Sequence, residues 1–209
     1  MAEIIPSINV DNFEEVARRI KLVEPFVDWV HLDVSDGTFT KHVSWHNPKD
    51  LIGFETSAKI EVHLMINKPE KEIGEWLMTS ASRLIFHQEA TKSHDLIIEK
   101  IHEAKKEVGI SVQPDTSWLK LFPYFNKVDL LQILGVSPGP SGQVLSEEAI
   151  HKIGHVKHTS HPCIIEVDGG INTENALALL KEGADILVAG NAIFNSQNIE
   201  KTIKEFKNL

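Results

Sequence analysis

Val30-His31-Leu32-Asp33-Val34-Ser35-Asp36-Gly37 reads as a short buried β-strand that ends in a turn. Successive side chains of a strand point to opposite faces, so His31 and Asp33 share one face and the valines and the leucine share the other. The apolar face is suited to a covering helix, and Asp36-Gly37 supplies typical turn chemistry. The stretch therefore predicts two potential metal ligands at the C-terminal end of a buried strand.

Short β-branched segments of this kind alternate with amphipathic stretches along the chain, which is typical of strand–helix units around a parallel sheet. We expect strands at Glu3–Ile8, Trp29–Val34, Lys59–Met65, Arg83–His87, Gly109–Val112, Leu130–Leu134, Ile164–Val167 and Ile186–Ala189. We expect helices at Phe13–Val23, Pro69–Met78, His94–Lys106, Glu147–His158, Thr173–Lys181 and Asn198–Phe206. The helical signal is weak after the second and fifth strands, so those connections are expected to hold only a turn or two.

These strand–helix units follow one another without a linker, a repeat or a low-complexity tract. Eight units favour a closed (β/α)8 barrel, the TIM barrel of the α/β class, over an open doubly wound sheet. A length of 209 residues and a hydrophobic content of 42% suffice for one core. We therefore expect a single domain that spans residues 1–209.

Overall charge and cysteine content restrict the expected partners. The formal net charge of -9 and the lack of a basic stripe argue against binding to nucleic acid or to a membrane. Cys163 is the only cysteine, which excludes an internal disulfide and favours a reducing compartment, so the cytoplasm is expected. Neither a secretory leader nor a run long enough to cross a bilayer is visible. A soluble homo-oligomer that acts on a small molecule is the expected class.

Several of the predicted strands end in polar side chains. In TIM barrels, the catalytic groups lie at the C-terminal ends of the strands. Ser7 ends the first strand, His31 and Asp33 the second and His63 the third, while Asp168 follows the seventh. Two imidazoles and two carboxylates around one mouth suit one divalent metal ion, with zinc favoured and iron, manganese or cobalt as alternatives. Taken alone, His63 is better explained as a core histidine and Asp168 as a turn aspartate, whereas His31 and Asp33 on one buried strand are less easily explained in this way. Together they favour the metal site, because unpaired buried charge is costly.

Glycine-rich turns follow the last predicted strands, where such barrels often bind phosphate with backbone amides. Gly169-Gly170 comes after the seventh strand and Gly190-Asn191 after the eighth. The segment 137–143, Ser-Pro-Gly-Pro-Ser-Gly-Gln, follows the sixth strand and can close over the same group. Simple chain reversal explains each turn equally well. An acidic protein nevertheless needs a local site of this kind to hold a phosphate.

Two further groups of histidines have simpler explanations. His151, His155 and His158 share one helical face opposite apolar residues, so we expect them to be solvated. His42 and His46 lie in a long loop, where a lid and mere surface packing are equally good interpretations.

The chain resembles the ribulose-phosphate 3-epimerase family over nearly its whole length. The resemblance rests on these segments, in this order: Pro6-Ser7-Ile8, the stretch 31–37, His63-Leu64-Met65, the segment 137–143, Glu-Val-Asp-Gly-Gly-Ile-Asn at 166–172 and Val-Ala-Gly-Asn-Ala-Ile-Phe at 188–194. It implies a TIM barrel of the ribulose-phosphate-binding type, a sugar-phosphate substrate and a divalent metal ion held by His31, Asp33, His63 and Asp168. It also implies acid/base roles for Asp33 and Asp168. By the same resemblance, the substrate would be contacted by Ser7, His63, Met65, Gly139, Ser141, Gly142, Gly169, Gly170, Gly190 and Asn191.

The resulting hypothesis is reversible interconversion of D-ribulose 5-phosphate and D-xylulose 5-phosphate by two-aspartate proton transfer through a metal-stabilised enediolate. Departures from the family at Ser35 and Gly135 leave 3-epimerisation of a ketohexose 6-phosphate, such as allulose 6-phosphate, as an alternative. A barrel that binds a sugar phosphate without turnover is another. Carbon–carbon lyase chemistry is disfavoured, because the second strand has no lysine between Asp33 and Asp36.

Overall fold

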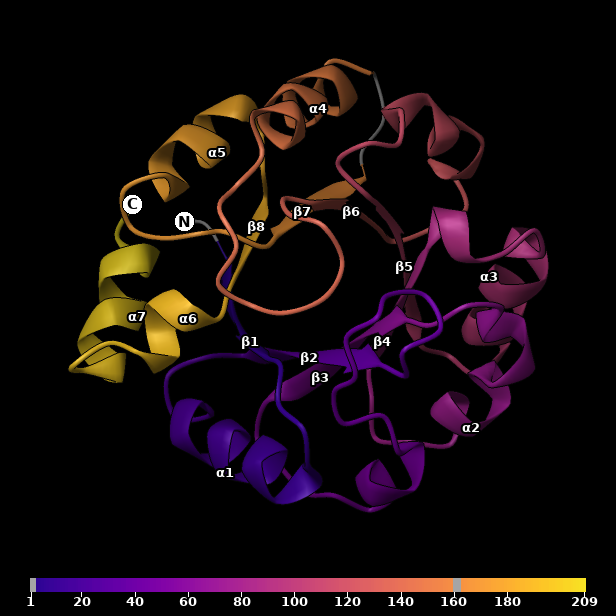
Figure 1. Cartoon of the computed structure of the whole chain (residues 1–209), viewed down its shortest axis with the longest axis horizontal. Coiled ribbons are helices and arrows are strands. Elements are labelled where there is room, and N and C mark those ends of the chain that lie inside the picture. The colour runs from indigo at the N-terminus through magenta and orange to yellow at the C-terminus, as the bar shows by residue number, and fades with distance from the viewer. Residues whose placement is uncertain (1–2, 160–162) are drawn as a thin grey trace.

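The computed structural model describes residues 3–159 and 163–209, and in these residues eight parallel strands close into a barrel. Each strand pairs with the next one in the chain and β8 pairs with β1, which gives the ring of arrows in Figure 1. The strands are β1 (Glu3–Ile8), β2 (Trp29–Ser35), β3 (Lys59–Met65), β4 (Arg83–His87), β5 (Glu107–Val112), β6 (Leu130–Leu134), β7 (Ile164–Asp168) and β8 (Ile186–Ala189). The predicted TIM barrel is confirmed.

Helices surround the barrel on its outer side (Figure 1). They are α1 (Phe13–Val23), α2 (Ile73–Leu77), α3 (His94–Glu103), α4 (Glu147–Lys157), α5 (Ala176–Glu182), α6 (Asn191–Phe194) and α7 (Ile199–Lys207). Short 3-10 turns occur at Pro48–Leu51, Pro69–Lys71, Gln88–Ala90, Trp118–Lys120 and Phe122–Tyr124. The connections after β2 and β5 therefore hold only such turns, as predicted. Within the described ranges, no helix is long and apolar enough to cross a membrane.

Three helices differ from their predicted bounds by more than one residue at an end, for local reasons. The segment from Pro69 opens with a 3-10 turn, preceded by left-handed Lys68 (φ 57°), and becomes α-helical only at residue 73. The helix from His94 ends early because Lys105 is also left-handed (φ 57°). The segment from Thr173 begins as a turn, because the side chain of Asn172 accepts hydrogen bonds from the two backbone N–H groups at 174 and 175. The short α6 has no counterpart among the predicted helices.

Most of the hydrophobic core lies between the strands and the surrounding helices. Val30, Leu32 and Val34 point into this layer and are at most 1% exposed. A smaller apolar cluster lies on the interior faces of the strands and consists of Ile5, Trp29, Ile85, Leu130, Ile186 and Val188. His31 and Asp33 alternate with the outward-facing residues of β2 and therefore face the barrel interior, as predicted.

Arg83, on the interior face of β4, is a buried cation whose side chain is only 4% exposed. Its guanidinium lies 2.6 Å from Glu61 Oε2 and 2.6 Å from Glu107 Oε2, and it covers the ring of Trp29 at 4.1 Å from the centroid. Burial opposes its charge, but the nearby carboxylates outweigh burial and raise the pKa of Arg83. Arg83 therefore fixes Glu61 inside the barrel as half of a buried ion pair.

Replacing Arg83 by methionine is expected to destabilise the fold by about 3–5 kcal/mol, because the Glu61 carboxylate then stays buried without its cation. Urea unfolding followed by circular dichroism measures the change. Arg18→Met is the matched control: Arg18 also pairs with a glutamate, Glu15, but its side chain is 60% exposed. The control should leave the unfolding midpoint unchanged. An Arg83→Met protein with the midpoint of the unchanged protein would contradict the role given to this pair.

Candidate active site

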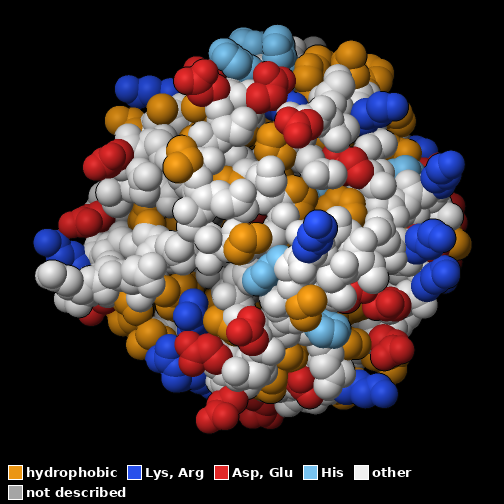
Figure 2. Space-filling view, viewed as in Figure 1, with side chains coloured by type: hydrophobic (Ala, Val, Ile, Leu, Met, Phe, Trp, Pro, Cys, Tyr) orange, Lys and Arg blue, Asp and Glu red, His pale blue; other side chains and the backbone are white. Residues whose placement is uncertain are grey.

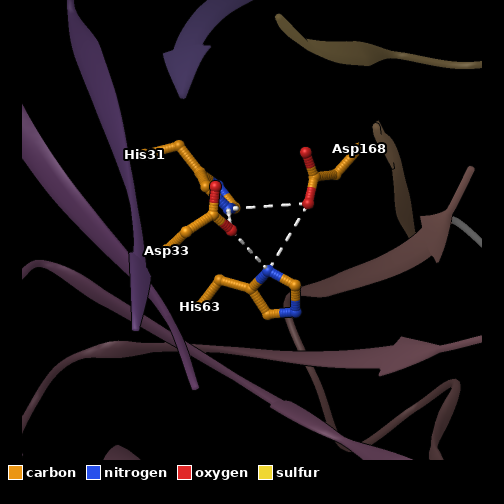
Figure 3. A group of neighbouring side chains, drawn as sticks. All are labelled: His31, Asp33, His63 and Asp168. Atoms are coloured by element: carbon orange, nitrogen blue, oxygen red, sulfur yellow. Dashed lines mark hydrogen bonds and ion pairs between the residues drawn. The ribbon is translucent and has the colours of Figure 1, made fainter. Parts of the chain in front are cut away.

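Four interior side chains meet near the C-terminal ends of three strands (Figure 3). His31 and Asp33 come from β2, His63 from β3 and Asp168 from the last position of β7. All four are buried, and one nitrogen or oxygen atom from each lies within 4.8 Å of the others. Strand register explains part of this, since Asp33 and His63 are direct partners in the β2–β3 pair. The structure thus brings together all four residues that were predicted to converge.

Distances within this cluster match the edges of a metal coordination sphere. His63 Nδ1 lies 3.2 Å from Asp33 Oδ1 and 3.4 Å from Asp168 Oδ2. His31 Nε2 lies 3.5 Å and 3.8 Å from the same two oxygens. Ligands bound tetrahedrally at about 2.1 Å from an ion lie about 3.4 Å from one another.

One nitrogen in the cluster supports the fit to a metal ion directly. His31 Nε2 is buried, points at the two carboxylates and has no hydrogen-bond partner in the part of the chain that the structure describes. A buried polar atom without a partner is costly, and coordination of an ion removes that cost. The residues present therefore fit a divalent cation.

Neighbouring side chains hold the cluster in place. Ser7 Oγ donates a hydrogen bond to Asp33 Oδ2 at 2.6 Å. His31 Nδ1 lies 2.7 Å from Glu61 Oε1, so it donates to a carboxylate and leaves Nε2 free for an ion. Glu61 in turn accepts from Arg83 at 2.6 Å. The orientation of His31 is thus fixed by two buried layers beneath the site.

Electrostatics make the cluster strongly attractive to positive charge. Burial opposes protonation of His31, but the charge of Asp168 and the contacts with Asp33 and Glu61 outweigh burial and raise its pKa. The pKa of His63 is raised in the same way, against burial, by Asp168 and Asp33. Burial also opposes ionisation of Asp33, yet the close contacts with both histidines lower its pKa below the usual range. Asp33 is therefore a carboxylate at neutral pH.

A second group of possible ligands, His31, Glu61 and Glu166, lies next to the first. Burial, reinforced by the charge of Glu61, raises the pKa of Glu166 well above its usual range, which favours the neutral acid. Arg83 Nη1 lies 3.9 Å from Glu166 Oε2 and supplies positive charge at this position. This group therefore needs no second cation.

A cavity of about 370 Å³ opens beside the two aspartates. The predicted site residues on its wall are Ser7, Asp33, Met65, Gly139, Ser141, Gly142, Asp168, Gly169, Gly170, Gly190 and Asn191. His31 and His63 are 0% exposed and lie behind the carboxylates rather than on the wall. On the face of the molecule that Figure 2 shows, most charged side chains lie toward the edge of the molecule, and few lie near its centre.

Glycine is required at two positions in this wall. At Gly170 (φ 74°) a Cβ atom would lie 2.5 Å from the backbone nitrogen of Leu145, and at Gly142 (φ 87°) it would lie 2.8 Å from Asn191 Nδ2. The loops after β6, β7 and β8 therefore pack too closely for side chains at these points. Their backbone N–H groups remain able to approach a ligand.

Asn9 and His87 are among the residues near the site that the sequence prediction does not include. Asn9 lines the cavity and donates from Nδ2 to the backbone oxygen of Gly139 at 3.1 Å. His87 is buried at the end of β4, with its Nε2 2.8 Å from His63 Nε2. The sequence carries a signal for both, because Asn9 continues the alternation from Ser7 and His87 ends a predicted strand.

The loop 38–46 contributes side chains to the region above the strand ends. The ring of Phe39 packs on His87 with 4.5 Å between centroids, and His42 Nε2 lies 2.9 Å from Asn9 Oδ1. His42 therefore contacts a residue of the cavity wall, whereas His46 is exposed and contacts only the backbone oxygen of Ser44 among the interactions described. His151 and His155 of α4, and His158 directly after it, are exposed as expected.

Solved structures with other activities share this fold. The chain matches a structure of 3-hexulose-6-phosphate synthase with a TM-score of 0.71 at 14% identity, covering 100% of this chain and 99% of the other. It matches a mutant tryptophan synthase α-subunit from Pyrococcus furiosus with a TM-score of 0.75 at 13% identity, covering 100% of both chains. At such low identity the likeness concerns the fold alone.

Several sequence relatives are named ribulose-phosphate 3-epimerase. The chain is 29% identical to the protein of that name from Schizosaccharomyces pombe, over 99% of this chain and 93% of the relative. The identity is 31% for Bacillus subtilis, over 99% of both chains, and 34% for Synechocystis sp., over 98% of this chain and 93% of the relative. The sequence pattern of the ribulose-phosphate 3 epimerase family matches residues 3–194. The chain therefore belongs to the ribulose-phosphate 3-epimerase family and is an isomerase of this type.

Proposed function

We propose that the protein interconverts D-ribulose 5-phosphate and D-xylulose 5-phosphate by moving a proton at the third carbon of the sugar. The observation that carries this proposal is the position of Asp33 and Asp168, which lie together on the wall of a cavity bordered by glycine-rich loops. The aspartates can exchange a proton with the reacting carbon, and the backbone N–H groups of the loops can bind the phosphate.

Inversion at a carbon beside a ketone requires a base on one face of the carbon and an acid on the other. Asp33 comes from β2 and Asp168 from β7, two strands separated by β1 and β8, so the carboxylates can address opposite faces. The neighbouring histidines keep Asp33 ionised by lowering its pKa. The hydroxyl of Ser7 orients the carboxylate by a hydrogen bond. One aspartate takes the proton and leaves an enediolate, and the other returns a proton from the opposite face. The substrate epimer decides which aspartate acts first.

We further propose that His31, Asp33, His63 and Asp168 hold one divalent metal ion. The two nitrogen and two oxygen donors suit zinc, with iron, manganese or cobalt as alternatives. When bound, such an ion supplies positive charge that stabilises the negative charge developing on the substrate oxygens. The two buried histidines close the site from behind, and the carboxylates face the cavity.

The phosphate group is proposed to lie among the loops that follow β6, β7 and β8. Gly142, Gly170 and Gly190 line the cavity there, and two of them have positive φ angles of 87° and 74°. Successive backbone N–H groups in such turns form concave sites for anions. A protein with a formal net charge of -9 depends on local donors of this kind to hold a phosphate.

The two departures from the family pattern do not reach the cavity wall. Ser35 Oγ donates to the backbone oxygen of His42 at 2.7 Å. Gly135 is packed so closely that a Cβ atom there would overlap the backbone oxygen of Gly169. These positions therefore give no structural reason to prefer a ketohexose 6-phosphate. Parallel kinetics on pentulose and hexulose phosphates would separate the two substrates, and binding without turnover would indicate a non-catalytic barrel.

Replacing Asp33 or Asp168 by asparagine is expected to lower kcat by about 10²–10⁴-fold, the usual contribution of a positioned acid or base. Asp11→Asn, in the exposed turn before α1, makes the same chemical change away from the site and should retain full activity. The assay follows D-ribulose 5-phosphate in D₂O by NMR and measures deuterium at the third carbon. Full activity of either variant would remove that aspartate from the mechanism, and turnover without deuterium at this carbon would refute proton abstraction.

Asn191→Asp is expected to raise KM for the sugar phosphate by about tenfold or more, with a smaller change in kcat. The new carboxylate repels the phosphate equally before and during the reaction, so binding rather than chemistry suffers. Asn195→Asp adds the same charge at the exposed C-terminal end of α6 and is the control. Equal KM values for the two variants would contradict a phosphate site beside residue 191.

A further inference from the structure

His87 is a buried polar side chain that neither proton transfer nor metal coordination uses directly. It ends β4 and is 0% exposed. Its Nε2 lies 2.8 Å from Nε2 of His63, the histidine of the cluster that comes from the neighbouring strand β3. A hydrogen bond between two imidazoles requires one ring to carry the proton and the other to accept it. This contact therefore restricts the protonation of His63.

The geometry of His63 decides which ring carries that proton. Nδ1 of His63 faces the carboxylates of Asp33 and Asp168, at 3.2 Å and 3.4 Å, so Nδ1 is the nitrogen that meets a cation. A neutral imidazole that uses Nδ1 as a ligand carries its proton on Nε2. His63 therefore donates through Nε2, and His87 accepts through its own Nε2. Ring centroids 4.9 Å apart and an interplanar angle of 30° are compatible with this edge-to-edge contact.

The remaining nitrogen of His87 must then carry a proton, and it faces a carboxylate. His87 Nδ1 lies 3.4 Å from Glu89 Oε2, and neither atom has a hydrogen-bond partner elsewhere in the residues that the structure describes. The other oxygen of Glu89 accepts the backbone N–H of Gln113 at 2.9 Å, which holds the carboxylate in place. The ring of Phe39 packs on His87 and shields it from the solvent side. The three side chains thus form a directed chain from His63 to Glu89.

We propose that His87 is a positioning residue that, together with Glu89, fixes the orientation and proton of His63 so that Nδ1 points at the metal ion. This inference rests on the proposed metal site. It gives His63 the same kind of support that Glu61 gives His31, with one additional imidazole between the ligand and the carboxylate. Hydrogen bonds of this kind hold a ligand ring in place and increase its basicity.

Two substitutions separate this role from simple packing. His87→Leu fills the space but cannot accept a hydrogen bond, whereas the side-chain oxygen of His87→Gln can accept one from His63 Nε2. His87→Leu is expected to weaken zinc binding by about 10–100-fold, and His87→Gln is expected to recover most of that loss. A competition titration against a coloured zinc chelator measures the affinity, with circular dichroism as the check on folding.

His94 provides the matched control, because it lies outside the chain from His63 to Glu89. It stacks on Tyr124 with 4.9 Å between centroids, and its Nε2 contacts the backbone oxygen of Gln88 at 2.8 Å. His94→Leu and His94→Gln should therefore leave zinc affinity unchanged. Equal affinity of His87→Leu and the unchanged protein would overturn the positioning role, as would equally weak binding by His87→Leu and His87→Gln.

A spectroscopic measurement on the unchanged protein keeps the test independent of how the variants fold. Long-range ¹H–¹⁵N spectra of the zinc-loaded protein are expected to show zinc on Nδ1 of His63, a proton on its Nε2 and a proton on Nδ1 of His87. Zinc on Nε2 of His63 would overturn the inference while leaving the metal site intact. If the unchanged protein takes up no zinc, the metal site and the positioning role both fail.

Discussion

Four ionisable side chains buried within 4.8 Å of one another impose the constraint on which the rest of this interior depends. A buried charge without a partner is costly, so each member requires compensation from an adjacent layer. His31 meets Glu61, Glu61 meets Arg83 at 2.6 Å, and Asp33 meets Ser7. Branched apolar residues usually dominate the inside of such a barrel. Here Ser7, Glu61 and Arg83 replace part of that apolar packing, because the buried cluster requires polar partners.

The barrel divides this work between its two sides. Strands β1 to β4 supply buried side chains that hold one another by hydrogen bonds and ion-pair contacts, and each of these strands contributes at least one: Ser7, His31, Asp33, His63 and His87. The loops after β6, β7 and β8 supply backbone instead, and glycines allow them to pack closely around the cavity. Asp168 ends β7 and joins the two regions, because it belongs to the buried cluster and also lines the cavity. Figure 1 shows the connection after β6 curving across the opening that these regions share.

A short polar contact links the loops from both sides above the site. The side-chain oxygen of Asn9 lies 2.9 Å from His42 Nε2. The side-chain nitrogen of Asn9 donates a hydrogen bond to the backbone oxygen of Gly139. Asn9 therefore joins the loop 38–46 to the segment 137–143 through two part-buried contacts. Loops joined by few hydrogen bonds open at lower cost than packed elements, which suits the entrance of a binding cavity.

The sequence by itself determined the barrel and the four clustered residues, because both follow from local patterns. Alternation within a strand fixes which residues face inward, and the position of a residue at a strand end fixes how near the opening it lies. The partners of those residues are a different matter. Glu61, His87 and Asn9 acquire their roles from contacts with residues 24 to 130 positions away in the chain. Only the closure and register of the barrel decide which of these side chains meet, because the partners come from different strands and loops.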